Sequence, residues 1–122
     1  KTNMQKPIYD TSQADDFPLK IEGAKGTPRF LGYRLVEGYP KFRYSQGKHV
    51  ITELIRMNNE KTGIRRTFTI SPPSRTVLKL SSTTLASTSA DRGIMKKDGM
   101  LNLSSSESAE FSVFIIPKEE NN

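Results

Sequence analysis

The sequence contains no cysteine and only one histidine. The absence of cysteine excludes disulfide bonds, thiolate metal sites, a cysteine nucleophile and covalent c-type haem attachment within this chain. A lone histidine cannot form a metal site by itself, and no cluster of Asp, Glu and His has the spacing of metal ligands. No apolar run approaches the ~20 residues that a membrane-spanning helix needs. We therefore predict no cofactor, no metal site and no membrane span.

Acidic side chains are scarce relative to basic ones. The chain has 13 Asp and Glu against 19 Lys and Arg, which gives a formal net charge of +6. A basic balance favours anionic partners such as nucleic acid, acidic glycans or anionic lipid surfaces. The alternative is a basic surface that is merely solvated, because the Lys and Arg residues never form a long block and the densest runs are pairs.

The sequence does contain a series of short alternating runs separated by turn residues, without a convincing helical period. Such runs, spaced about 8 to 12 residues apart, are typical of an antiparallel sandwich or barrel. We therefore predict an all-β fold, a β-sandwich of two antiparallel sheets. The predicted strands span 19–22, 29–36, 39–45, 48–57, 64–70, 76–81, 94–96, 100–103 and 111–117.

A chain of 122 residues is expected to form one domain. We assign residues 1–16 to an extended N-terminal arm, 17–117 to the sandwich and 118–122 to a C-terminal tail. The Ser/Thr-rich stretch 81–93 is predicted to be a loop that crosses between the sheets. The run at 111–116 is apolar on both faces, which is typical of a central strand that is covered on both sides.

Residues 29–70 predict a four-stranded antiparallel meander. Its register follows from tight turns at 37–38 and 46–47 and from a longer loop at 58–63. The predicted cross-strand pairs are Val36 with Tyr39, Arg34 with Lys41, Tyr33 with Phe42, Leu31 with Tyr44, Tyr44 with His49, Phe42 with Ile51, Ile51 with Ile70, Glu53 with Phe68 and Met57 with Ile64.

All three connections place the same apolar side chains on one face of this meander, whereas a slip of one residue would move them to the other face. We therefore expect this face to form the core of the sandwich. Its apolar members are Leu31, Tyr33, Leu35, Phe42, Tyr44, Ile51, Ile55, Phe68 and Ile70.

Three polar residues, His49, Glu53 and Arg66, share this apolar face. Glu53 lies diagonally across from Arg66, within reach on one face of a sheet. The expected role of these two residues is a partly buried structural ion pair that fixes the register. The alternative is a hydrolase-like enzyme that uses Glu53 with Arg66 or His49. No second carboxylate falls on this face, so no catalytic residue is assigned.

The opposite face of the meander carries a basic stripe. The candidate residues for binding a carbohydrate or a polyanion are Arg34, Lys41, Arg43 and Arg65, with Arg56 beside them. Val50 and Leu54 lie among them and favour a different reading, in which a second sheet or a partner domain covers part of this face. Nucleic acid is not expected, because this face lacks the exposed aromatic side chains on which bases stack.

An aromatic platform for sugar rings would need several exposed rings side by side. Tyr33, Tyr39, Phe42 and Tyr44 are close enough in the predicted register. All of them except Tyr39 point inward, however, so we expect them to belong to the core.

The stretches FLGYRLVEGYPKFRY, VITELI and GIRRTFTI resemble a β-rich domain of large secreted bacterial proteins, of the membrane-bound dehydrogenase and c-type-cytochrome-containing class. The match covers 29–70 well and the remainder loosely, and it concerns mostly core and turn positions. The haem-attachment motif of such proteins is absent, so only their accessory part is resembled and no catalytic residue carries over. The matching positions are Phe30, Gly32, Tyr33, Arg34, Leu35, Pro40, Phe42, Tyr44, Glu53, Arg66 and Phe68.

The resemblance implies a periplasmic or secreted location in a bacterium. Together with the missing catalytic motifs, it predicts a non-catalytic accessory or interaction domain. The expected partner is a neighbouring domain or another protein, and a glycan is the second choice. The alternative functions are a carbohydrate- or polyanion-binding module that uses the basic stripe, and a hydrolase-like enzyme that uses Glu53.

Overall fold

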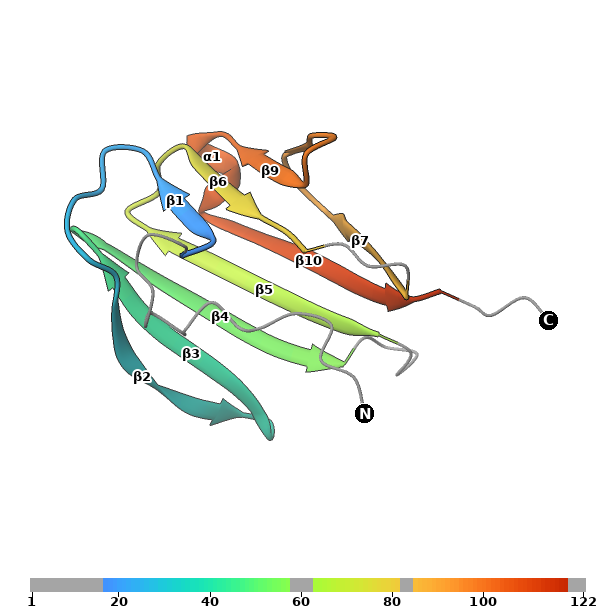
Figure 1. Ribbon diagram of the computed structural model, residues 1–122. Coiled ribbons are helices and arrows are strands. Elements are labelled where there is room, and N and C mark those ends of the chain that lie inside the picture. The colour runs from blue at the N-terminus through green and yellow to red at the C-terminus, as the bar shows by residue number, and fades with distance from the viewer. Residues whose placement is uncertain (1–16, 58–62, 82–84, 119–122) are drawn as a thin grey trace.

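The computed structural model describes residues 17–57, 63–81 and 85–118. Within them the chain is mostly strand, in two antiparallel sheets that face each other (Figure 1). This arrangement confirms the predicted all-β sandwich. The predicted arm at 1–16 lies outside the described residues, as does nearly all of the predicted tail at 118–122.

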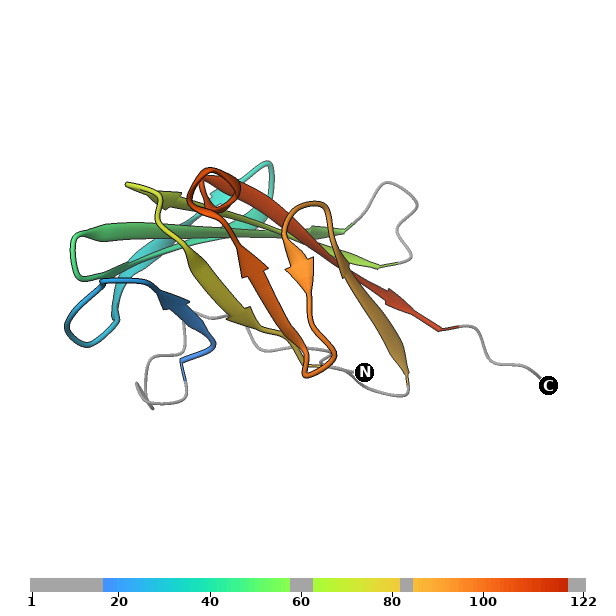
Figure 2. The same cartoon turned by 90° about the horizontal axis from the view of Figure 1, so that it is seen from above.

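The small sheet has four strands and the large sheet has six. In the order of pairing, the small sheet consists of β1 (Leu19–Ile21), β6 (Thr76–Lys79), β9 (Met100–Leu103) and β8 (Ile94–Met95). The large sheet consists of β2 (Arg29–Val36), β3 (Tyr39–Gln46), β4 (His49–Met57), β5 (Ile64–Ser71), β10 (Glu110–Pro117) and β7 (Ala86–Ala90). Seen from above, the small sheet lies on one side of the large one (Figure 2).

Strands β2 to β5 form the predicted meander, and most of its register is confirmed. The alternation of side chains along each strand therefore places the expected residues on the inner face, toward the small sheet. The confirmed pairs are Val36 with Tyr39, Arg34 with Lys41, Tyr33 with Phe42, Ile51 with Ile70, Glu53 with Phe68 and Met57 with Ile64.

A β-bulge in β2 overturns one predicted pairing. The pairing with β3 shifts between Phe30 and Gly32, so Phe30 rather than Leu31 lies opposite Tyr44. A bulge adds one residue to one strand of a pair, and the added residue is left unpaired. Leu31 takes this place here and is exposed instead of packed in the core.

The second tight turn lies one residue later than predicted, at 47–48. The buried Gln46 belongs to β3 because its side chain accepts a hydrogen bond from the Ile21 N–H and donates one to the Leu19 carbonyl in β1. The pairing consequently shifts by two residues, which preserves the face on which each side chain lies. Where Tyr44 with His49 and Phe42 with Ile51 were predicted, the observed pairs are Tyr44 with Ile51 and Phe42 with Glu53.

The stretch 81–93 is predicted to be a loop, and this is wrong in part, because the stretch contains the strand β7. β7 pairs with β10, which supplies the hydrogen-bond partners for its main chain. A sequence of Ser, Ala and Thr does not by itself predict a strand. The stretch does pass between the sheets, since β6 and β8 on either side belong to the small sheet. β10 lies inside the large sheet as expected, paired with β5 and β7. On its outer face Ser112 is buried whereas Ile116 is exposed, so this face is covered only in part.

One short helix, α1 (Ser105–Ser108), which the sequence did not predict, follows β9 and precedes β10. The bond between the Ser104 hydroxyl and the Glu107 N–H caps its first turn. No helix within the described residues is long and apolar enough to cross a membrane.

The core lies between the sheets, and the small sheet covers only part of the large one. In Figure 1, β2 and β3 extend beyond the small sheet. Tyr33 and Leu35 face inward by register, yet 63% and 64% of their surfaces are exposed. Their predicted place in the core is therefore wrong, because the covering sheet has fewer and shorter strands. The buried apolar core consists of Phe17, Leu19, Ile21, Tyr44, Ile51, Phe68, Ile70, Leu78, Leu80, Ala86, Leu101, Leu103, Phe111, Val113 and Ile115.

Candidate functional site

The ion pair between Glu53 and Arg66 lies inside the core. The Arg66 Nε donates to the Glu53 Oε2 at 2.6 Å, and the two side chains are 5% and 0% exposed. The Arg66 guanidinium carbon also lies 5.1 Å from the centre of the Phe68 ring. Glu53 therefore cannot contact a substrate in this conformation, and the geometry gives the hydrolase-like alternative no support.

Tyr44 lies beside this pair with its ring fully buried. The hydroxyl makes no hydrogen bond of ordinary geometry to the described residues, and the ring packs edge-on against Phe17 with 5.5 Å between centroids. Burial raises the pKa of the Tyr44 hydroxyl well above its usual value, and the negative charge of Glu53 raises it further. The phenol therefore keeps its proton at neutral pH and is not suited to transfer it.

His49 is buried at the end of the sandwich where β4 begins. Its Nδ1 lies 2.6 Å from the carbonyl oxygen of Pro72, to which it donates. The ring lines a cavity of about 150 Å³ together with Glu22, Lys48 and Ser74, among others. Pockets that bind small molecules usually measure about 300–1,000 Å³. His49 therefore serves as a link between β4 and the loop after β5.

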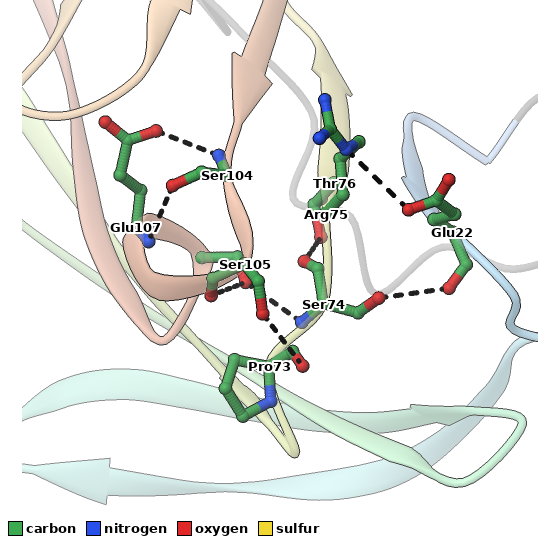
Figure 3. A network of polar contacts seen from close by, with 9 residues as sticks. Glu22, Pro73, Ser74, Arg75, Thr76, Ser104, Ser105 and Glu107 are labelled. Atoms are coloured by element: carbon green, nitrogen blue, oxygen red, sulfur yellow. Dashed lines mark hydrogen bonds and ion pairs between the residues drawn. The ribbon is translucent and has the colours of Figure 1, made fainter.

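A network of hydroxyl and backbone groups closes the same end (Figure 3). The Ser74 N–H donates to the Ser108 hydroxyl at 3.2 Å, and the Ser74 hydroxyl donates to the Glu22 carbonyl at 3.1 Å. The Ser104 N–H donates to a carboxylate oxygen of Glu107 at 2.8 Å, and this bond lowers the pKa of Glu107. Because these groups bond to one another, we interpret the network as a structural link between β1, β6 and α1.

Five basic side chains lie on the face of the large sheet that is turned away from the small sheet. We call this surface the outer basic face. In the observed register, like charges lie directly opposite each other at two places, which destabilises a sheet unless anions compensate. None of the five forms an ion pair with a described residue. The outer basic face consists of the pair Arg34 and Lys41, the pair Arg56 and Arg65, and Arg43.

Two of these arginines lie on aromatic rings. The Arg56 guanidinium carbon is 5.3 Å from the centre of the Tyr39 ring, and that of Arg65 is 5.7 Å from the centre of the Phe114 ring. Stacking of this kind orients the guanidinium and leaves N–H donors for a carboxylate or sulfate. The same contact occupies the two rings, so they are not open to stack on bases.

Val50 and Leu54, both half-buried, lie among the cations of the outer basic face. These residues suggested that a second sheet or a partner domain covers this face. The small sheet packs on the opposite side of the large sheet, so the prediction that a second sheet covers the outer basic face is wrong. A partner domain stays a prediction.

Sequence reasoning missed an exposed aromatic group on the inner face near β2. Phe42 lies between Phe30 and Tyr33, with 6.4 Å and 5.8 Å between the ring centroids. The alternation in the sequence assigned Tyr33 and Phe42 to the core. Phe30 was not assigned there, because it reaches the inner face only through the bulge at Leu31. No local signal could have corrected this, since their exposure depends on how far the small sheet extends.

Within the described part of the chain, no three His, Asp or Glu side chains gather in a group that could hold a metal ion. No family model, curated protein or solved structure matches this chain. The resemblance to the accessory domain of secreted bacterial proteins therefore stays a prediction from the sequence.

Proposed function

We propose that this chain is a non-catalytic interaction domain that docks an acidic surface of a partner protein or neighbouring domain on its outer basic face. The observation that supports this most is the set of five cations on one sheet face, none of them ion-paired within the described residues. An acidic partner would relieve the repulsion between Arg34 and Lys41 and between Arg56 and Arg65.

The composition of this face favours a protein over a glycan as the partner. Val50 and Leu54 lie among the cations, and apolar surface contributes to binding only where a partner excludes water from it. Arginine, which supplies most of the charge here, is enriched at protein interfaces. An acidic or sulfated glycan on the same face is the competing ligand. The proposed setting, an exported bacterial protein in the periplasm or outside the cell, is supported only by the sequence resemblance.

Binding to two immobilised anionic probes tests the proposal. Poly-L-glutamate represents an acidic protein surface and heparin represents a sulfated glycan. We compare the wild type with a double variant, Arg34→Glu with Arg43→Glu, and with a control of equal charge change on the small-sheet side, Lys79→Glu with Lys96→Glu. All four positions are exposed, so both variants should fold.

We expect the wild type to bind poly-L-glutamate in a manner that weakens as salt screens the charges. The outer-face variant should bind at least about tenfold more weakly, as expected for loss of two charge contacts, and the control should change little. Equal weakening in both variants would mean that net charge alone drives binding, and would contradict the proposal. Binding to heparin without binding to poly-L-glutamate would identify the glycan as the ligand instead.

A further inference from the structure

Strand β2 forms one edge of the large sheet and pairs only with β3 among the described strands. It is eight residues long. The bulge disturbs its start, and residues 32–36 pair regularly. An edge strand presents unpaired backbone N–H and C=O groups on its open side, and these can pair with a strand of another chain.

The two sides of this edge differ in chemistry. On the inner side, Tyr33 and Leu35 are 63% and 64% exposed beyond the reach of the small sheet. On the outer side, Arg34 lies next to Lys41 in the outer basic face. A strand added beside β2 would place its side chains alternately on these two sides.

We propose that β2 binds an extended segment of a partner protein as an additional strand, in which apolar residues alternate with acidic ones. This inference rests on the proposed function and specifies the form of the partner. The apolar side chains of the segment would cover Tyr33 and Leu35 on the inner side. Its carboxylates would pair with Arg34 and Lys41 on the outer side, while the backbone groups continue the sheet.

Charge argues against a second copy of this chain as the occupant. The strand RFLGYRLV carries Arg29 and Arg34 and no carboxylate. Pairing two such strands would bring arginines together in molecules that each carry a net charge of +6. Like charges placed next to each other discriminate against a partner, so this edge selects an acidic segment over itself.

The other edge of the large sheet lacks this combination. β7 has the sequence ASTSA, with neither a charge nor a large apolar side chain. Strand addition is therefore expected at β2 and not at β7.

Two labelled octapeptides test the proposal with the full chain. One alternates valine and glutamate, and the other has the same composition with the valines and glutamates in separate blocks. Fluorescence anisotropy measures binding, and amide hydrogen exchange measures protection of residues 32–36. We expect the alternating peptide to bind at least about tenfold more tightly and to slow amide exchange in β2. Only this peptide can pair with β2 while all its valines lie on the side of Tyr33 and Leu35 and all its glutamates lie on the side of Arg34.

A matched pair of variants separates the edge from general surface effects. Leu35 and Ile94 are both 64% exposed, the first on β2 and the second on β8 in the small sheet. Leu35→Lys should weaken binding of the alternating peptide by about tenfold or more, because a charge replaces the apolar contact. Ile94→Lys adds the same charge and should leave binding unchanged.

Equal affinity for both peptides, without protection of β2, would overturn strand addition. Continued binding to poly-L-glutamate in that case would leave the proposed function standing. Failure of every anionic probe would overturn both. A wild-type dimer that Leu35→Lys dissociates would identify a second copy as the occupant and overturn the inference.

Discussion

At Glu53 and Arg66, two charges lie where water does not reach them. Such a pair adds little net stability by itself, but removing one partner leaves the other charge buried and unpaired. We therefore expect Glu53→Ala to lower the free energy of unfolding by about 3–5 kcal/mol. Urea denaturation, monitored by circular dichroism, measures this change in the free energy of unfolding.

Two further variants identify the cause of that loss. Replacing both partners, as Glu53→Leu with Arg66→Met, should destabilise the protein less than Glu53→Ala alone, because no charge is stranded. Glu110→Ala, at an exposed carboxylate, should change stability by no more than about 0.5 kcal/mol. If Glu53→Ala costs less than about 1 kcal/mol, the pair behaves as an exposed one and the buried geometry is wrong.

Which way each of these side chains points could be predicted from the sequence, because strand residues alternate with a period of two. Glu53 and Arg66 accordingly face inward as expected. Burial could not be predicted in the same way. Tyr33 faces inward like Glu53, yet it is largely exposed, because burial depends on what lies opposite.

At the scale of single elements, the turn before β8 packs directly against β9. A Cβ atom at Gly93 would lie 2.7 Å from the Asn102 carbonyl oxygen, whereas one at Gly38 would meet nothing within 4 Å. The two glycines share nearly the same backbone angle, with φ of +85° and +86°.

Gly38→Ala should therefore cost only about 1–2 kcal/mol for the left-handed backbone. Gly93→Ala should cost about 1–3 kcal/mol more, since the added methyl group overpacks the turn. Urea denaturation of the two variants in parallel gives the difference directly. Equal losses would show that β8 and β9 can move apart without cost.

Most strands could be predicted because alternation and turn residues mark them locally. β7 could not, because Ser, Ala and Thr form a strand there only through pairing with β10. The predicted position of the second tight turn was wrong by one residue for a related reason. Gln46 stays in β3 because it bonds to β1, which is distant in sequence.

At the scale of the whole molecule, the two sheets differ in width, and this mismatch creates both candidate surfaces. The large sheet turns one entire face away from the small sheet, and the cations lie there. Its β2 edge extends past the small sheet. Phe30 and Tyr33, which face inward but are exposed, lie on that edge. The number of strands in each sheet depends on long-range pairing, so the sequence pattern predicted two sheets without predicting their widths.

This mismatch predicts a gradient of local stability across the large sheet. β5 is paired on both sides and covered by the core, whereas β2 is paired on one side and its inner residues are exposed. Segments with few buried contacts open at lower free energy, so amides of β2 should exchange at least about tenfold faster than those of β5. Native-state hydrogen exchange by NMR measures both strands in one sample. If β2 is as protected as β5, its edge is already occupied in the isolated protein, and protection that is lost on dilution would identify another copy of the chain as the occupant.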